Sequence, residues 1–161
     1  MNTIKKIIVM SGFLLVCISA IAQKNLNIEN IFENYGKKEG SVLIELTKDV
    51  LGNYTKINRY KSMIIPFDAE IADICANAVK TDIEDGIIIM ESTKKGKIET
   101  AYYCLKKNDN NSDYEYILFT KKNKKITLIY LRGDFKPHKL ESELNILKNL
   151  FITINNKQIK L

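Results

Sequence analysis

Few residues in this chain could act as a catalytic base or a metal ligand. The only histidine is His138, which follows Pro137 at the start of an expected helix. A lone histidine cannot build a His-rich metal site. A serine-type triad would need His138 as its base, yet no serine lies in a Gly-x-Ser-x-Gly turn. We therefore predict no catalytic residue and no metal ligand of these classes.

Scattered carboxylates offer a second route to catalysis. Glu45, Asp49 and Glu91 are examples, and a pair of acids can perform general acid–base chemistry. The sequence does not show that any two of them meet. An enzyme built from such carboxylates is kept as an alternative.

An alternating set of oxygen ligands resembles the start of a calcium loop. It consists of Asp109, Asn111 and Asp113. Tyr114 then stands where the loop needs glycine, and Thr120 stands where it needs a bidentate glutamate. We interpret the segment as a polar hairpin loop and predict no cofactor.

Cys75 and Cys104 are the cysteines that remain once the leader described below is removed. Cys75 falls on the apolar face of an expected helix, and Cys104 is expected on an inward strand face. Cysteines in an oxidising compartment often pair, so we predict a disulfide between them. Two separate buried thiols are the alternative.

Lysines crowd two short polar breaks between expected strands. In an antiparallel meander, successive turns alternate between the two ends of the sheet, so these two breaks should share one end, about 10 Å apart. The intervening break, with Asp109 and Asp113, should point to the other end. We predict a positive patch that aids solubility or attracts an acidic partner. Its members are Lys94, Lys95, Lys97, Lys121, Lys122, Lys124 and Lys125.

Residues 1–22 have the three parts of a cleavable secretory signal peptide. Lys5 and Lys6 form a basic start, an apolar stretch follows, and Ala20-Ile21-Ala22 gives a small-x-small exit. The apolar stretch of about 15 residues is shorter than the roughly 20 that a membrane-spanning helix needs. Val16 is too large for lipoprotein processing at Cys17. We expect cleavage after this exit and export to the periplasm or beyond the cell.

Residues 23–161 have the length and composition of one domain. They hold no second apolar stretch long enough to cross a membrane. The leader removes two lysines, which leaves 23 basic and 19 acidic residues and a net charge of +4. Because this excess is mild and the chain is expected to be exported, nucleic acid is not an expected partner.

Hydrophobic periodicity divides this domain into helices and strands. Helices are predicted over 27–35, 68–83 and 137–151, with Asp68 as the N-cap of the second. Breaks between the later strands are too short for a crossover helix, so neighbouring strands should be antiparallel. The simplest architecture is an α+β fold with a single antiparallel sheet of about five or six strands and helices packed on one face. The strands are predicted over 41–46, 57–65, 87–92, 98–107, 114–120 and 126–132.

Several motifs follow the leader: Ile31-Phe32-Glu33-Asn34-Tyr35, Gly40-Ser41-Val42 leading into Leu46-Thr47-Lys48-Asp49-Val50-Leu51, and Ile129-Tyr130-Leu131-Arg132-Gly133-Asp134-Phe135. With them the chain resembles small secreted proteins of unknown function that are common in Bacteroidetes. The resemblance covers nearly all of the mature chain. It implies an exported α+β domain among envelope components, and it supplies no catalytic residues.

These observations favour a non-catalytic envelope domain that binds a protein or an anionic surface component. An enzyme with scattered carboxylates and a structural subunit are the alternatives. A deep pocket with convergent acids would favour the enzyme, whereas a flat apolar or basic patch would favour binding. Tyrosines on the expected strands could line such a patch, namely Tyr102, Tyr103, Tyr114, Tyr116 and Tyr130.

Overall fold

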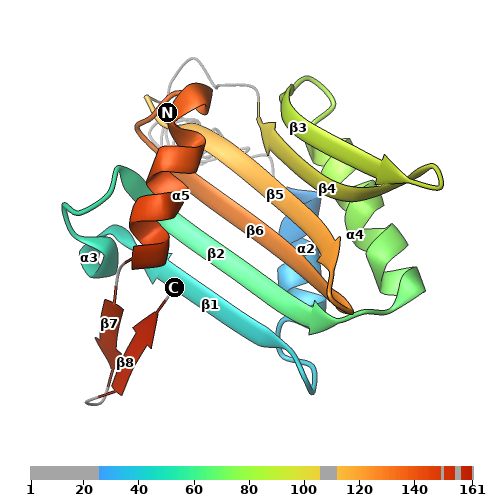
Figure 1. Ribbon diagram of the computed structural model, residues 1–161, viewed down its shortest axis with the longest axis horizontal. Helices are drawn as coiled ribbons and strands as arrows, with labels where there is room; N and C mark the ends of the chain where they lie inside the picture. The colour runs from blue at the N-terminus through green and yellow to red at the C-terminus, as the bar shows by residue number, and fades with distance from the viewer. Residues whose placement is uncertain (1–25, 106–111, 150, 155–156, 161) are drawn as a thin grey trace, which may run out of the picture.

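The computed structural model describes residues 26–105, 112–149, 151–154 and 157–160. Its centre is a six-stranded antiparallel sheet in the order β1-β2-β6-β5-β4-β3 (Figure 1). This arrangement confirms the predicted α+β class and the single main antiparallel sheet. The strands are β1 (Val42–Thr47), β2 (Ile57–Pro66), β3 (Ile87–Lys94), β4 (Lys97–Cys104), β5 (Tyr114–Lys122) and β6 (Lys125–Gly133).

Two helices pack on one face of the sheet, called here the back face because it points away from the viewer in Figure 1. They are α2 (Asn27–Tyr35) and α4 (Ala69–Asp82). The carboxylate of Asp68 accepts a hydrogen bond from the backbone N of Ile71 at 2.9 Å, so the predicted N-cap is present. Helices and strands share a buried apolar core that includes Ile28, Phe32, Met63, Cys75, Val79, Phe119 and Leu128.

The last helix lies on the opposite, front face. η1 (Pro137–Lys139) and α5 (Leu140–Asn149) follow β6 and lie in front of the strands in Figure 1. Their core is separate and includes Leu46, Cys104, Tyr116, Leu118, Leu131, Phe135, Leu140 and Leu147. We predicted that all the helices pack on one face of the sheet. This is confirmed for α2 and α4, but it is wrong for α5, which packs on the other face.

The cause of this second layer lies in the central strands. Tyr116, Ile117, Leu118 and Phe119 are buried without interruption along β5. Because successive strand residues point to opposite faces, such a run fills a core on each side of the sheet. The front face therefore needs a covering helix of its own, and α5 supplies it over part of the sheet.

Two further segments complete the described part of the fold. α3 (Lys48–Leu51) is a single helical turn after β1, and the tail forms a separate two-stranded sheet. The strands of that small sheet are β7 (Phe151–Ile154) and β8 (Lys157–Lys160). Within the described ranges, no helix combines the length and the apolar character that a membrane crossing requires.

Candidate binding surface

Both lysine-bearing breaks are tight hairpin turns. Lys95 and Gly96 join β3 to β4 with φ values of 52° and 74°, and Asn123 and Lys124 join β5 to β6 with φ values of 54° and 57°. Positive φ at both central positions is the mark of a type I′ turn, whose twist suits a β-hairpin. Residues with a β-carbon disfavour this conformation by roughly 1–2 kcal/mol. Lysine thus occupies turn positions, 95 and 124, that glycine would fill with less strain.

Strand register brings the two turns to one end of the sheet. Lys94 pairs with Lys97 at the first turn, and Lys122 pairs with Lys125 at the second. Since β4 and β5 are antiparallel neighbours, the two turns project in the same direction, about two strand spacings or 10 Å apart. This is the arrangement expected from the meander. We call its members the lysine cap: Lys94, Lys95, Lys97, Lys121, Lys122, Lys124 and Lys125.

The end of β4 and the start of β5 lie at the opposite end of the sheet. Leu105 N donates a hydrogen bond to Glu115 O there at 2.8 Å, and Asp113 lies beside the start of β5. Asp109 and Asn111, the other members of the calcium-like pattern, lie outside the described residues.

Asp73 on α4 is a counter-charge beneath the lysine cap. Its Oδ2 accepts a hydrogen bond from Lys97 Nζ at 2.6 Å. That hydrogen bond lowers the pKa of Asp73, and the charges of Lys97 and Lys121 lower this pKa further. One carboxylate therefore senses lysines from both turns, which supports their proximity. Most of the cap is exposed, and Lys121 is half-buried.

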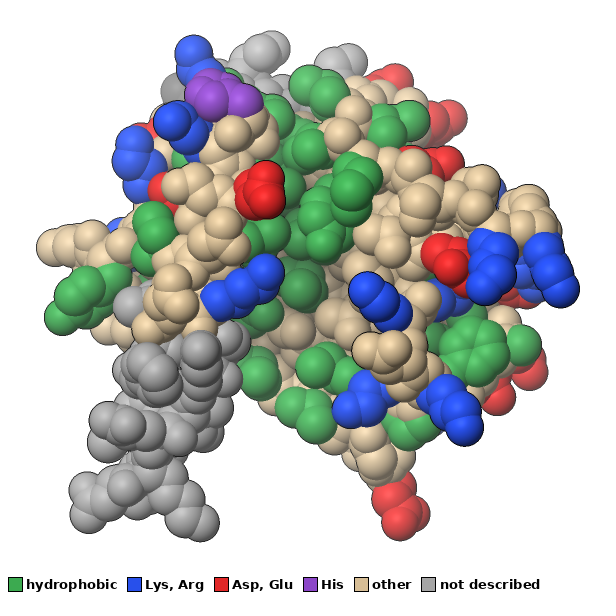
Figure 2. All heavy atoms as spheres, in the orientation of Figure 1, with side chains coloured by type: hydrophobic (Ala, Val, Ile, Leu, Met, Phe, Trp, Pro, Cys, Tyr) green, Lys and Arg blue, Asp and Glu red, His purple; other side chains and the backbone are tan. Residues whose placement is uncertain are grey.

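Beside α5, the front face is open and apolar. Figure 2 shows apolar side chains in a hollow next to the ridge that α5 forms. We call this surface the open face. Leu118 on its floor is 3% exposed, whereas Met90 at its edge is 42% exposed. One row of paired residues crosses all six strands here: Ile44, Ser62, Ile129, Leu118, Tyr102 and Met90.

The side chains on the open face change in character toward the lysine cap. The next row lies two residues further along the strands. It holds three threonines that are paired in register, Thr100, Thr120 and Thr127. Two residues further along β5 and β6 stand Lys122 and Lys125, and strand alternation places them on the same face. The surface therefore runs from apolar side chains through hydroxyls to ammonium groups.

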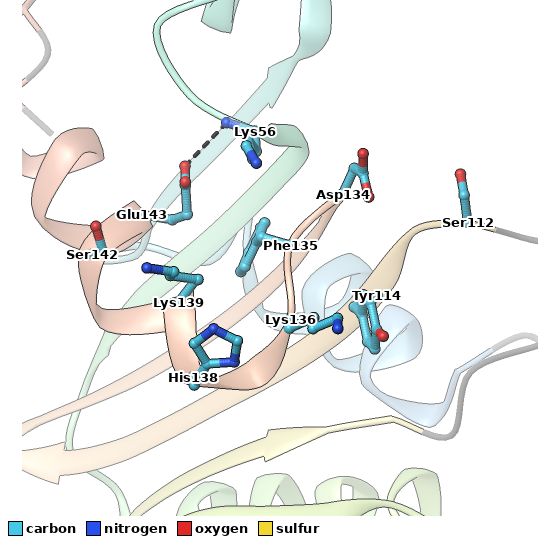
Figure 3. Close-up of a pocket in the computed structure, with 10 residues that line it drawn as sticks. All are labelled: Lys56, Ser112, Tyr114, Asp134, Phe135, Lys136, His138, Lys139, Ser142 and Glu143. Atoms are coloured by element: carbon cyan, nitrogen blue, oxygen red, sulfur yellow. Dashed lines mark hydrogen bonds between the residues drawn. The ribbon is translucent and has the colours of Figure 1, made fainter.

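Figure 3 shows a pocket at the other end, where β6 leads into η1 and α5. It encloses about 600 Å³ and has the exposed His138 in its lining. Its buried carboxylate, Glu143, accepts hydrogen bonds from Thr55 Oγ1 at 2.7 Å and Lys56 N at 3.0 Å. Glu143 thus anchors the segment before β2 to α5, and the second acid, Asp134, is exposed. The lining comprises Lys56, Ser112, Tyr114, Asp134, Phe135, Lys136, His138, Lys139, Ser142 and Glu143.

The acids considered for catalysis do not form a shared site. Glu45 on β1 pairs with Arg59 at 3.1 Å, and Glu91 on β3 accepts a hydrogen bond from the Tyr103 hydroxyl. β1 and β3 are the two edges of the sheet, so strand spacing separates these acids by roughly 24 Å. Asp49 is exposed on α3. The arrangement offers no convergent pair among the three.

The structure does not bring the two cysteines together. Cys75 is buried in the back core, whereas Cys104 is buried in the front core, with the sheet between them. Both are free, which corrects the predicted disulfide. The error came from assigning Cys104 to the face that α4 covers, although it points to the face that α5 covers. Burial raises the pKa of each thiol to about 11, so both stay protonated at neutral pH.

An ion-pair group beneath α2 was not predicted. Lys61 on β2 is only 8% exposed, and its Nζ donates to Glu29 Oε2 of α2 at 2.8 Å. The same ammonium lies 4.9 Å from the centre of the Phe32 ring. Strand alternation in the sequence could have indicated this group, because it puts Arg59 and Lys61 on the same face as the buried Met63. These charges are mutually satisfied and hold α2 to the sheet.

Fold and surface together define an α+β domain whose exposed sheet face is apolar at one side and basic at the other. Residues 15–144 match a family of unknown function, DUF6108. Because the match spans most of the chain, the protein belongs to this family. Searches of curated proteins and of solved structures gave no match.

Proposed function

We propose that the protein is an exported, non-catalytic envelope domain of a Bacteroidetes cell, and that it binds an acidic segment of a partner protein. The observation that carries this proposal is the order of side chains on the open face. A mainly apolar row, a threonine row and the lysine cap follow one another toward one end of the sheet. A partner segment with an apolar part followed by an acidic part would match that order.

The positions of the carboxylates support binding over catalysis. General acid–base chemistry needs two groups within reach of one substrate atom. Glu45 and Glu91 stand on opposite edges of the sheet, and Glu143 in the pocket is already bonded to Thr55 and Lys56. A partly exposed apolar surface with a charged border is instead typical of a protein-interaction site.

The shape of the surface supports a protein segment over a lipid bilayer. The turns of the lysine cap project from the end of the sheet, while Leu118 lies almost fully covered on the floor beside α5. A flat bilayer could touch the projecting turns and would not reach this floor. An extended segment can lie along the strands, where it contacts the half-buried Tyr102 and Ile129, and can also reach the turns.

The two parts of the surface would contribute differently. Exposed ion pairs add about 0.2–1 kcal/mol each and chiefly raise the rate of encounter. Burial of apolar area supplies about 25 cal/mol per Å², so the open face would provide most of the affinity. The strained Lys124 is consistent with this steering role of the charges. A glycine at position 124 would avoid the strain of the positive φ but would lack the positive charge.

The start of α2 is compatible with export by a cleaved leader. α2 begins at Asn27, shortly after the expected cleavage at Ala22. Its first backbone amides are held by Asp82 at the end of α4, at 2.8 and 2.9 Å. The folded domain therefore makes its own contacts to this helix without the leader.

The proposal is tested by binding of a labelled synthetic peptide, in which alternating leucine and serine residues are followed by a run of glutamates. We expect the mature domain to bind it with an affinity that falls as salt rises. Lys122→Gln with Lys125→Gln should weaken binding roughly tenfold. The control, Lys136→Gln with Lys139→Gln, removes the same charge at the other end and should leave the affinity unchanged.

Two outcomes would contradict the proposal. Equal losses from both lysine pairs would mean that the peptide responds only to net charge. Binding to phosphatidylglycerol vesicles that depends on Lys122 and Lys125, without binding to the peptide, would assign the surface to lipid instead.

A further inference from the structure

β3 is an edge strand with an exposed apolar segment. Ile87, Ile88 and Met90 are 57%, 61% and 42% exposed, respectively. β3 pairs with β4 alone, and Figure 1 shows no described element beyond its outer edge. β1, the other edge strand, has one large apolar side chain with such exposure, Val42 at 51%.

An unpaired strand edge is a template for another strand. It presents a row of backbone N–H and C=O groups, and proteins usually blunt such an edge with charges or bulges, or cover it. On β3 the charged Glu91 follows the apolar residues, and no described strand pairs with the outer edge. Here a register shift between Ile88 and Met90 makes Ile89 an extra residue. Ile88 faces back beside Tyr103, while Met90 faces front beside Tyr102. An added strand would thus cover apolar side chains on both faces.

The charges at the ends of β3 select its partner. Glu84 and Asp85 precede the strand, whereas Lys94 and Lys95 close it. A second β3 running antiparallel would set the acids of each copy against the lysines of the other. We infer that two copies of this chain associate edge to edge through β3, with a two-fold axis that relates them.

The faces of the side chains specify the register of this pairing. If the axis passes between Ile89 and Met90, these two residues lie opposite each other on the front face. The same pairing brings the turn that precedes β3, with Glu84 and Asp85, near the hairpin turn of the other copy, with Lys94 and Lys95, and this approach occurs twice in a self-complementary interface. One sheet would then run through both copies and join their open faces side by side.

The inference is independent of the proposed function, and the self-association of the mature chain tests it. Sedimentation equilibrium should show a monomer–dimer equilibrium. Met90→Lys should raise the dissociation constant roughly tenfold or more, because it places a charge against Ile89 of the other copy, in an apolar contact. The control Val42→Lys changes a side chain of similar exposure on β1 and should not affect the dimer.

A charge exchange tests the antiparallel register. One variant carries Lys94→Glu and Lys95→Glu, and the other carries Glu84→Lys and Asp85→Lys. Each should self-associate more weakly than the wild type, because both ends of its β3 have the same sign. An equimolar mixture should restore the dimer, since each chain then opposes the other with complementary ends.

A wild-type chain that stays monomeric throughout, or a mixture that associates no better than its separate variants, would overturn the inference. Thermal melts would establish that each variant is folded. Peptide binding through Lys122 and Lys125 can succeed or fail independently, because those residues lie outside β3.

Discussion

Asp82 provides the most direct test of how the domain is held together. The residue before α2 is Leu26, whose side chain cannot cap a helix. Asp82, 55 residues away from Asn27 in the sequence, does so instead. Its Oδ1 accepts hydrogen bonds from Asn27 N at 2.8 Å and Asn27 Nδ2 at 2.7 Å, and its Oδ2 accepts one from Ile28 N at 2.9 Å. The change Asp82→Ala removes this cap and leaves the amides without their acceptor.

The expected cost follows from these contacts. Loss of an N-cap destabilises a protein by about 0.5–2 kcal/mol, and loss of a negative charge at a helix N-terminus adds about 0.3–1 kcal/mol. We therefore expect Asp82→Ala to lower the free energy of unfolding by about 2 kcal/mol. For a domain of this size, the melting temperature should fall by about 6–8 °C. Asp82→Asn keeps one oxygen acceptor and should lose about half as much.

Chemical and thermal denaturation of the mature domain measures both changes. Glu33→Gln is the matched control, because it removes one exposed negative charge from α2 itself and should change stability by less than about 0.5 kcal/mol. Hydrogen exchange should show that Asp82→Ala weakens protection in α2 first. An Asp82→Ala variant as stable as the Glu33→Gln control would refute the capping role.

Three further predictions concern the lysine cap and the thiols. The hydrogen bond from Lys97 lowers the pKa of Asp73, so Lys97→Gln should raise that pKa in an NMR titration. A carboxylate whose pKa is lower in the folded than in the unfolded state stabilises the fold when the pH is above its unfolded-state pKa. The difference in stability between the wild type and Lys97→Gln should therefore fade as the pH falls below about 4. Cys75 and Cys104 should resist a thiol reagent in the native state and yield two thiols after denaturation without reductant; one disulfide in that assay would contradict the structure. Lys124→Gly should stabilise the domain by about 1 kcal/mol, because it relieves a positive φ of 57°, and a loss of stability would show that the turn is not strained.

Local patterns were sufficient to predict the elements of the fold. The apolar spacing from 27 to 35 predicted α2 at the bounds that the structure has, and Asp68 was identified as an N-cap from its residue type and position. The meander was predictable because short polar breaks permit only antiparallel neighbours. The common end of the lysine turns follows from that connectivity alone.

Contacts between distant segments were not predictable in the same way. The periodicity of α5 shows that it has an apolar side and does not show which sheet face receives it. The position of Cys104 depended on that choice, which explains the wrong disulfide. Asp82 and Lys61 are ordinary charged residues in the sequence, and their roles arise only when α2 docks beside them.

The central claim is that the open face and the lysine cap form one binding surface. Chemical-shift mapping of the mature domain with the leucine–glutamate peptide tests this claim most directly. We predict shifts in the row containing Tyr102 and Ile129, continuing through Thr127 to Lys122 and Lys125. Shifts confined to the pocket residues of η1 and α5, or to the lysines without the apolar row, would contradict it.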